Sequence, residues 1–153
     1  MKDFIRDYAT AAFRYYARCG MPRYEDMYRA AYNIALEDER REIVRVKGVG
    51  NPTQQAIINA EAEMDRRAGE FRDILAVEQA LAAMRPEVRL AVKFIYFAGA
   101  DRELVKGDIE RRVHRAEIEI PASRRQIYRW LYGARVLFSE IRGLRIPGQG
   151  QWS

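Results

Sequence analysis

The feature that most constrains the fold of this chain is the spacing of its apolar residues, which recur every three to four positions over nearly the whole sequence. That period is typical of amphipathic α-helices, whereas a half-buried strand would alternate at every second residue. Most of the few prolines and glycines fall between the periodic segments, where such residues end and begin helices. We find no internal repeat and no strand-rich region. The sequence therefore predicts an all-α fold.

The first 84 residues are predicted to form an N-terminal helical module for oligomerisation or partner binding. Within it, Thr53 to Met84 contains no proline and is predicted to be one long central helix. This helix either packs against the two helices before it or pairs with a second copy of the chain as a coiled coil, which leaves a homodimer open. A Gly/Asn/Pro cluster at residues 47–52 is a predicted hinge.

Residues 85–145 are predicted to form a separate C-terminal domain, followed by a flexible tail at 146–153. Pro86 restarts the helical pattern, since proline is favoured in the first turn of a helix. The segment from Val88 to Phe97 is apolar on much of its circumference, so we expect it at the buried centre of the domain.

Charge and composition narrow the class of function. The chain has a formal charge of +5, and the basic excess lies in its second part: residues 85–153 hold 14 Lys and Arg against 8 Asp and Glu, and residues 1–84 hold 13 against 14. Such an asymmetry indicates a module that faces a polyanion. Cys19 is the only cysteine and His114 the only histidine, so neither a disulfide nor a zinc cluster is predicted. We expect no enzyme, no cofactor and no metal.

The location of the protein is predicted from its N-terminus and its hydropathy. The first residues are charged too early for a secretory signal, and no apolar run approaches the ~18 residues of a membrane span. We therefore expect a cytoplasmic protein with no membrane partner.

The segment from 123 to 142 carries the strongest functional signal. Ser123 followed by Gln126 is a capping-box arrangement, which specifies where the helix starts. One face of the helix is apolar, and it consists of Ile127, Trp130, Leu131, Ala134, Leu137, Phe138 and Ile141. Between residues 123 and 145 there are six arginines and a single acidic residue.

These residue types suit double-stranded DNA. A helix fits the major groove, arginine can donate two parallel hydrogen bonds to guanine, and glutamine can pair with adenine. Backbone phosphates can be bound by arginine, tyrosine and the amides of a helix N-terminus. The predicted DNA-binding residues are Ser123, Arg124, Arg125, Gln126, Tyr128, Arg129 and Arg135. Among them Arg135 lies further along the helix, and it is predicted to meet phosphate rather than bases.

Three short motifs in residues 84–142 resemble a known module. They are residues 84–89 (MRPEVR), 108–113 (DIERRV) and 123–130 (SRRQIYRW). Together they resemble the fourth region of bacterial sigma factors and, more closely, phage transcriptional regulators of the RinA/ArpU type. The resemblance implies a helix-turn-helix, promoter binding, activation of late phage or mobile-element genes, and contact with RNA polymerase.

One departure from that module concerns its turn. Nine residues (114–122) separate Val113 from Ser123, whereas the turn of the family is only a few residues long. Either the first helix continues to about Glu117, or a small wing or extended piece is inserted.

Two alternative functions also remain: a sigma-like module that docks on RNA polymerase as a protein partner, and a small terminase-type protein that binds DNA in phage packaging.

Overall fold

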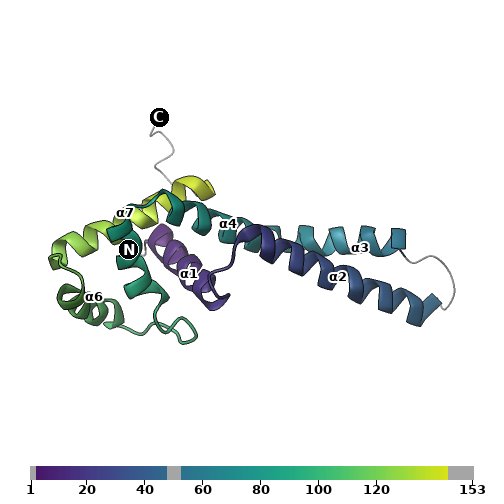
Figure 1. Ribbon diagram of the computed structural model, residues 1–153, viewed down its shortest axis with the longest axis horizontal. Coiled ribbons are helices and arrows are strands. Elements are labelled where there is room, and N and C mark those ends of the chain that lie inside the picture. The colour runs from purple at the N-terminus through teal and green to yellow at the C-terminus, as the bar shows by residue number, and fades with distance from the viewer. Residues whose placement is uncertain (1–2, 48–52, 145–153) are drawn as a thin grey trace. The chain divides into compact units, whose positions relative to one another are not determined.

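The computed structural model describes residues 3–47 and 53–144, and these form seven α-helices and one π-helical turn without any β-strand (Figure 1). The predicted all-α class is confirmed. Residues 48–52 of the predicted hinge and the predicted tail at 146–153 lie outside the described residues. None of the helices formed by the described residues combines the length and the hydropathy that crossing a membrane requires.

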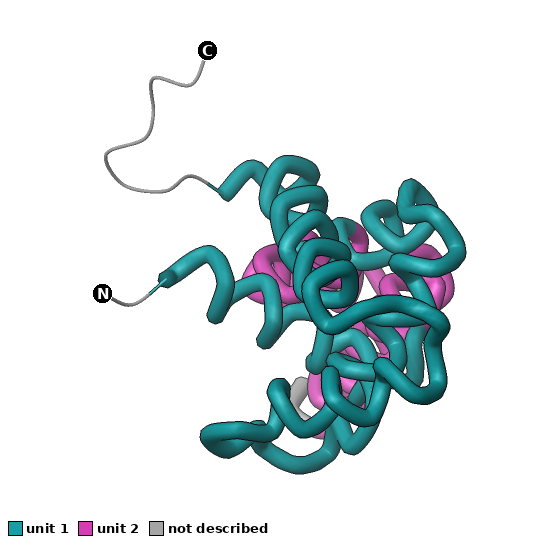
Figure 2. The backbone as a smooth tube through the Cα atoms, turned by 90° about the vertical axis from the view of Figure 1, so that its left-hand side faces the viewer, with its two compact units in different colours: residues 1–21, 76–153 teal, residues 22–75 magenta. Residues whose placement is uncertain are grey.

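The chain divides into two compact units, shown in different colours in Figure 2. Unit 1 contains residues 1–21 and 76–153, and unit 2 contains residues 22–75. This division differs from the predicted boundary between residues 84 and 85. The first helix belongs to the same unit as the C-terminal helices, because its buried side chains pack against theirs.

Unit 2 is built on two helices that lie side by side, α2 (Tyr24–Lys47) and α3 (Thr53–Arg66). Small side chains allow the close approach, since Ala56 and Ala60 of α3 are fully buried. A hydrogen bond of 3.1 Å from Asn59 Nδ2 to Glu39 Oε2 joins the two helices. The first part of α4 (Ala68–Ala83) completes the unit, and the ring of its Phe71 meets Tyr28 edge-on with centroids 5.3 Å apart.

The predicted single helix from Thr53 to Met84 is wrong at one point. It is interrupted at Arg67, so that α3 ends at Arg66 and α4 begins at Ala68. The N–H of Arg67 is shared between the carbonyls of Glu63 and Met64, at 3.3 and 3.1 Å, which tightens the last turn of α3. Gly69 follows two residues later, and glycine is a poor helix former.

Unit 1 contains α1 (Phe4–Arg18), α5 (Pro86–Val92), the π-helical turn η1 (Lys93–Phe97), α6 (Asp108–Glu119) and α7 (Arg124–Arg142), together with the end of α4. Local signals define several helix ends. The Asp3 side chain accepts from the N–H of Arg6 at 2.9 Å and caps α1, and Pro86 occupies the first turn of α5. Gly143 ends α7 in the left-handed conformation, at φ 80°.

Aromatic rings form the centre of unit 1. Phe13 of α1 stacks on Tyr96 of η1 at 5.8 Å and lies 5.7 Å from Phe138 of α7. All three residues are at most 2% exposed. Ala91, Val92 and Ile95 are fully buried as well, so one face of the segment from Val88 to Phe97 lies in the core as predicted, whereas Leu90 on another face is 50% exposed. Because Phe13 fills the space between η1 and α7, α1 is part of this unit.

The carbonyl groups at the end of η1 are satisfied by arginines from two other helices. The Arg14 guanidinium donates to the carbonyls of Tyr96 (3.0 Å), Ala98 (3.4 Å), Gly99 (2.9 Å) and Arg102. Arg112 of α6 donates to Ile95 O at 2.7 Å. Buried carbonyls need donors, and a π-helical turn cannot supply them all from within. These arginines therefore fix η1 to α1 and α6.

Candidate nucleic-acid interface

The helices α6 and α7 form a packed pair joined by a short connection. Helix α6 extends to Glu119 and α7 begins at Arg124, so residues 120–123 make the turn. Of the two interpretations of residues 114–122, a longer first helix is therefore the correct one, and no wing or strand is formed by this described segment. Val113, Ala116 and Ile120 are buried and hold α6 and the turn to the rest of unit 1.

The start of α7 has the predicted cap. Ser123 is extended (φ −74°, ψ 160°), and its Oγ accepts from the N–H of Gln126 at 3.2 Å. This hydrogen bond satisfies one of the backbone donors that a helix N-terminus leaves unpaired. The other first-turn amides point out of the helix at its start, where they remain able to meet an anion.

The inner face of α7 agrees with its predicted apolar stripe except at its end. Ile127, Leu131, Ala134 and Phe138 are at most 1% exposed. Ile141 falls in the same predicted stripe, but it is 37% exposed. It lies beyond Phe138, whose ring contacts Phe13 and Tyr8 of α1.

The outer face of α7 presents two arginines in the first two turns. Arg125 and Arg129 are exposed, and neither forms a hydrogen bond or an ion pair with any part of the chain that the structure describes. They lie one turn apart, so both guanidinium groups project from the same side of the helix. This is the pair of predicted residues that the structure leaves able to bind a ligand directly.

Arg124 is exposed but engaged with α6. Its Nε donates to Glu117 Oε1 at 2.8 Å, and its Nη2 lies 3.4 Å from His114 Nδ1. The hydrogen bond to Glu117 is the main cause that raises the pKa of Arg124. One turn further along, Tyr128 is 37% exposed. Partial burial, followed by the charge of Glu110, raises the pKa of its hydroxyl, so this group remains a neutral hydrogen-bond donor.

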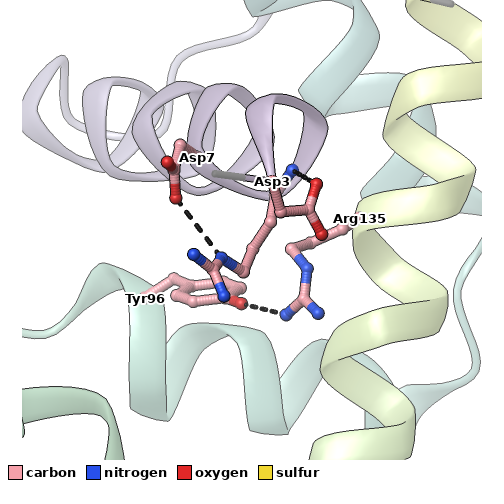
Figure 3. A network of polar contacts seen from close by, with 5 residues as sticks. Asp3, Asp7, Tyr96 and Arg135 are labelled. Carbon is pink, nitrogen blue, oxygen red and sulfur yellow. Dashed lines mark hydrogen bonds and ion pairs between the residues drawn. The ribbon is translucent and has the colours of Figure 1, made fainter. Parts of the chain in front are cut away.

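Arg135, the last of the predicted residues, lies in a different environment. It is half-buried, and its Nη1 donates to the Tyr96 hydroxyl at 2.8 Å (Figure 3). The structure thus brings together six predicted residues at the start of α7, and places Arg135 apart from them, beside η1 and α1. Gln126 is half-buried within the group of six.

Sequence reasoning missed the arginines of α1 and of the segment before α6. Arg14 and Arg135 both bond to Tyr96, although 82 and 39 residues respectively separate them from it in sequence. Arg18 and Arg102 line the same side of unit 1. A local pattern contains no signal for such an arrangement, because it arises only when α1 folds onto η1 and α7.

The division into units sharpens the charge asymmetry. Unit 1 contains 18 Lys and Arg against 11 Asp and Glu, whereas unit 2 contains 9 against 11. The basic excess of the chain therefore resides entirely in the unit that contains α6 and α7. Such an excess favours association with a polyanion at low ionic strength.

Comparisons with protein-family models, with curated proteins and with solved structures found no match for this chain. Within the described residues, no group of three His, Cys, Asp or Glu side chains is placed to hold a metal ion. What can be inferred about function therefore rests on the geometry and chemistry of unit 1.

Proposed function

We propose that this protein is a transcriptional regulator that binds double-stranded DNA through α6 and α7, acting as a helix-turn-helix. Two packed helices joined by a turn of three or four residues are the elements of that motif. In it, the second helix enters the major groove and presents the side chains of its first turns to the bases. Helix α7 would be the recognition helix.

The observation that carries this proposal is the pair of Arg125 and Arg129 on the outer face of α7. Both guanidinium groups are exposed and uncommitted within the described chain, on the side opposite Ile127 and Leu131. An unpaired arginine can donate two parallel hydrogen bonds to guanine O6 and N7, and such pairs are the commonest specific contact with DNA. The capped start of the helix adds free amides for a phosphate.

The arginines that are already engaged fit secondary roles. Arg124, held by Glu117, would contact the backbone at the turn, and Tyr128 would donate its hydroxyl to a phosphate oxygen. The resemblance to sigma-like phage regulators supports a promoter as the target and a phage or mobile-element origin.

The test measures DNA affinity and its dependence on salt. The full chain is first used to select bound sequences from a pool of randomised duplexes, and the enriched site is then titrated by fluorescence anisotropy. Replacing Arg125 or Arg129 by alanine should cost about 1–3 kcal/mol on that site if each contacts a base. The slope of log K against log[salt] should be about −0.9 for each phosphate contacted.

A matched control separates a specific contact from a simple loss of charge. Arg29→Ala with Arg40→Ala removes two exposed charges from α2 of unit 2, as Arg125→Ala with Arg129→Ala does from α7. If the two double variants bind the selected site equally well, the assignment of α7 as the recognition helix is wrong.

A second candidate is docking on a protein such as RNA polymerase through α6. It is favoured by Ile118, a large apolar residue that is 78% exposed on the outer face of α6. This alternative predicts that the randomised pool yields no enriched sequence, and that Ile118→Ser abolishes capture of purified polymerase while DNA retention stays at the non-specific level.

A further inference from the structure

Unit 1 contains a cleft of about 660 Å³, whose lining includes Tyr128 of α7. Its walls come from α1, from η1 and the segment that follows it, and from α6 and α7, so it lies wholly within unit 1. Five arginines drawn from several parts of the chain line it, namely Arg6, Arg14, Arg18, Arg102 and Arg135. Three acidic residues, Asp7, Glu103 and Glu110, line it as well, which leaves an excess of positive charge.

Two of the five arginines are already engaged with other groups of unit 1. Arg14 gives the donors of both terminal nitrogens to backbone carbonyls at the end of η1 and just after it, and it contributes charge to the cleft. Arg6 donates only its Nε to Asp7, at 3.3 Å, and the adjacent carboxylate offsets its charge.

The other three guanidinium groups retain free donors. Arg18 and Arg102 are exposed, and their side chains form no hydrogen bond or ion pair with the described part of the chain. Arg135 uses only Nη1, which donates to Tyr96 (Figure 3). Like charges that share a concave surface repel one another, and an anion among them removes that cost.

The Tyr96 hydroxyl points to what the cleft binds. Tyr96 is 2% exposed and lines the cleft, and its oxygen accepts from Arg135 at 2.8 Å. Its own hydrogen has no acceptor among the residues that the structure describes. A buried hydroxyl without an acceptor is costly, and an oxyanion placed beside Arg135 would accept from both groups.

We propose that this cleft binds phosphate: Arg135 and the Tyr96 hydroxyl hold one phosphate group, and the guanidinium groups of Arg18 and Arg102 add positive charge to the same cleft. A phosphate offers several oxygens and up to two negative charges, which suits arginines that approach from different helices. The group has one of two sources: the backbone of the DNA that α7 contacts, or a free phosphorylated small molecule. The first source rests on the proposed function, and the second does not.

Inorganic pyrophosphate is the probe for a free phosphate ligand. Isothermal titration of the full chain in a phosphate-free buffer of low ionic strength is expected to show saturable binding at one site. Tyr96→Phe removes a single hydroxyl and keeps the ring that stacks on Phe13, so the fold is retained. This change, or Arg18→Ala with Arg102→Ala, should weaken pyrophosphate binding about tenfold or more, the loss expected for a charge-assisted hydrogen bond.

Duplex DNA tests the other source. If the backbone supplies the phosphate, Arg18→Ala with Arg102→Ala should make the salt slope of DNA binding shallower by about 0.9 for each phosphate that is no longer bound. The preferred base sequence should not change, because phosphate contacts carry no direct sequence information. If a free molecule supplies it, the DNA slope stays the same and only pyrophosphate binding is weakened.

Arg125→Ala with Arg129→Ala separates this proposal from the proposed function. That variant should retain pyrophosphate binding and lose the selected DNA site. If the cleft variants change neither pyrophosphate binding nor the salt slope, the cleft proposal is overturned, and the recognition role of α7 is judged by its own test. If the cleft variants lose pyrophosphate binding while the changes at Arg125 and Arg129 leave DNA binding intact, the cleft proposal stands and the proposed function fails.

Discussion

Replacing Arg14 by methionine is expected to lower the free energy of unfolding of unit 1 by about 3 kcal/mol. Methionine keeps most of the aliphatic volume of the side chain and removes the guanidinium. The substitution therefore isolates the hydrogen bonds to the end of η1 from the effect of an empty cavity.

The magnitude follows from the burial of each acceptor. The bond to Tyr96 O is fully buried, so its loss should cost about 1.5–3 kcal/mol. The bonds to Ala98, Gly99 and Arg102 are part-buried, and water can replace them at about 0.5 kcal/mol each. Burial, followed by the neighbouring charges of Arg112 and Arg18, lowers the pKa of Arg14, so its charge is itself held at a cost. That cost keeps the expected total at about 3 kcal/mol, at the lower end of what the four hydrogen bonds together would give.

The assay is equilibrium unfolding in urea, followed by the fluorescence of Trp130 on α7. A Trp152→Phe background leaves Trp130 as the sole tryptophan, so the signal reports on unit 1. With a slope of about 1.5 kcal/mol/M, the midpoint should fall by about 2 M. The control is Arg18→Met, which replaces an exposed residue one turn further along α1. This substitution should change the free energy of unfolding by less than about 0.5 kcal/mol. Equal midpoints for the two variants would refute the role assigned to Arg14.

Two further predictions concern α6. The Asp108 carboxylate accepts from the N–H of Val105 at 2.7 Å, and this bond, followed by that from Arg111, lowers the pKa of Asp108. A carboxyl group whose pKa is lowered stabilises the fold at a pH above its ordinary pKa, and this stabilisation is lost as the pH falls below about 4. Hydrogen exchange at the Val105 amide should therefore accelerate below that pH relative to its intrinsic rate. Asp108→Asn should abolish this pH dependence. Glu117→Gln should release Arg124 from its ion pair, so that DNA affinity measured by anisotropy rises and the salt slope steepens by up to about 0.9. A loss of affinity in that variant would mean that the pair positions α7 instead.

The features that the sequence predicted well are those that depend on nearby residues. The all-α class, the limits of α7, its Ser123 cap and most of its buried stripe follow from contacts three or four residues apart. The burial of the segment containing η1 was predictable for the same reason, since apolar residues cover most of its circumference. Its π-helical geometry was not, because that geometry depends on donors supplied by other helices.

The features that depend on distant partners were not predictable. Apolar residues of α1 lie on two adjacent stripes, one through Phe4 and one through Ile5. Phe4 is 62% exposed, whereas Ile5, Ala9, Phe13 and Tyr16 form the buried face. Only the positions of η1 and α7 decide which stripe is covered. For the same reason, the predicted domain boundary differs from the observed division into units. The hydrogen bond of Arg135 to Tyr96 and the arginine-lined cleft likewise have no signal in a local pattern.

The π-helical turn η1 makes unit 1 sensitive to the number of residues in this part of the chain. A π-helical turn contains one residue more per hydrogen-bonded ring than an α-helical turn. Deleting one residue within η1 would let an ordinary α-helix form, and because the π-helical turn accommodates that one extra residue, the segments after it would keep nearly the same direction. A further inserted residue has no such compensation and would rotate everything after it by about 100° around the helix axis, so insertions in η1 should be tolerated less well than a single deletion.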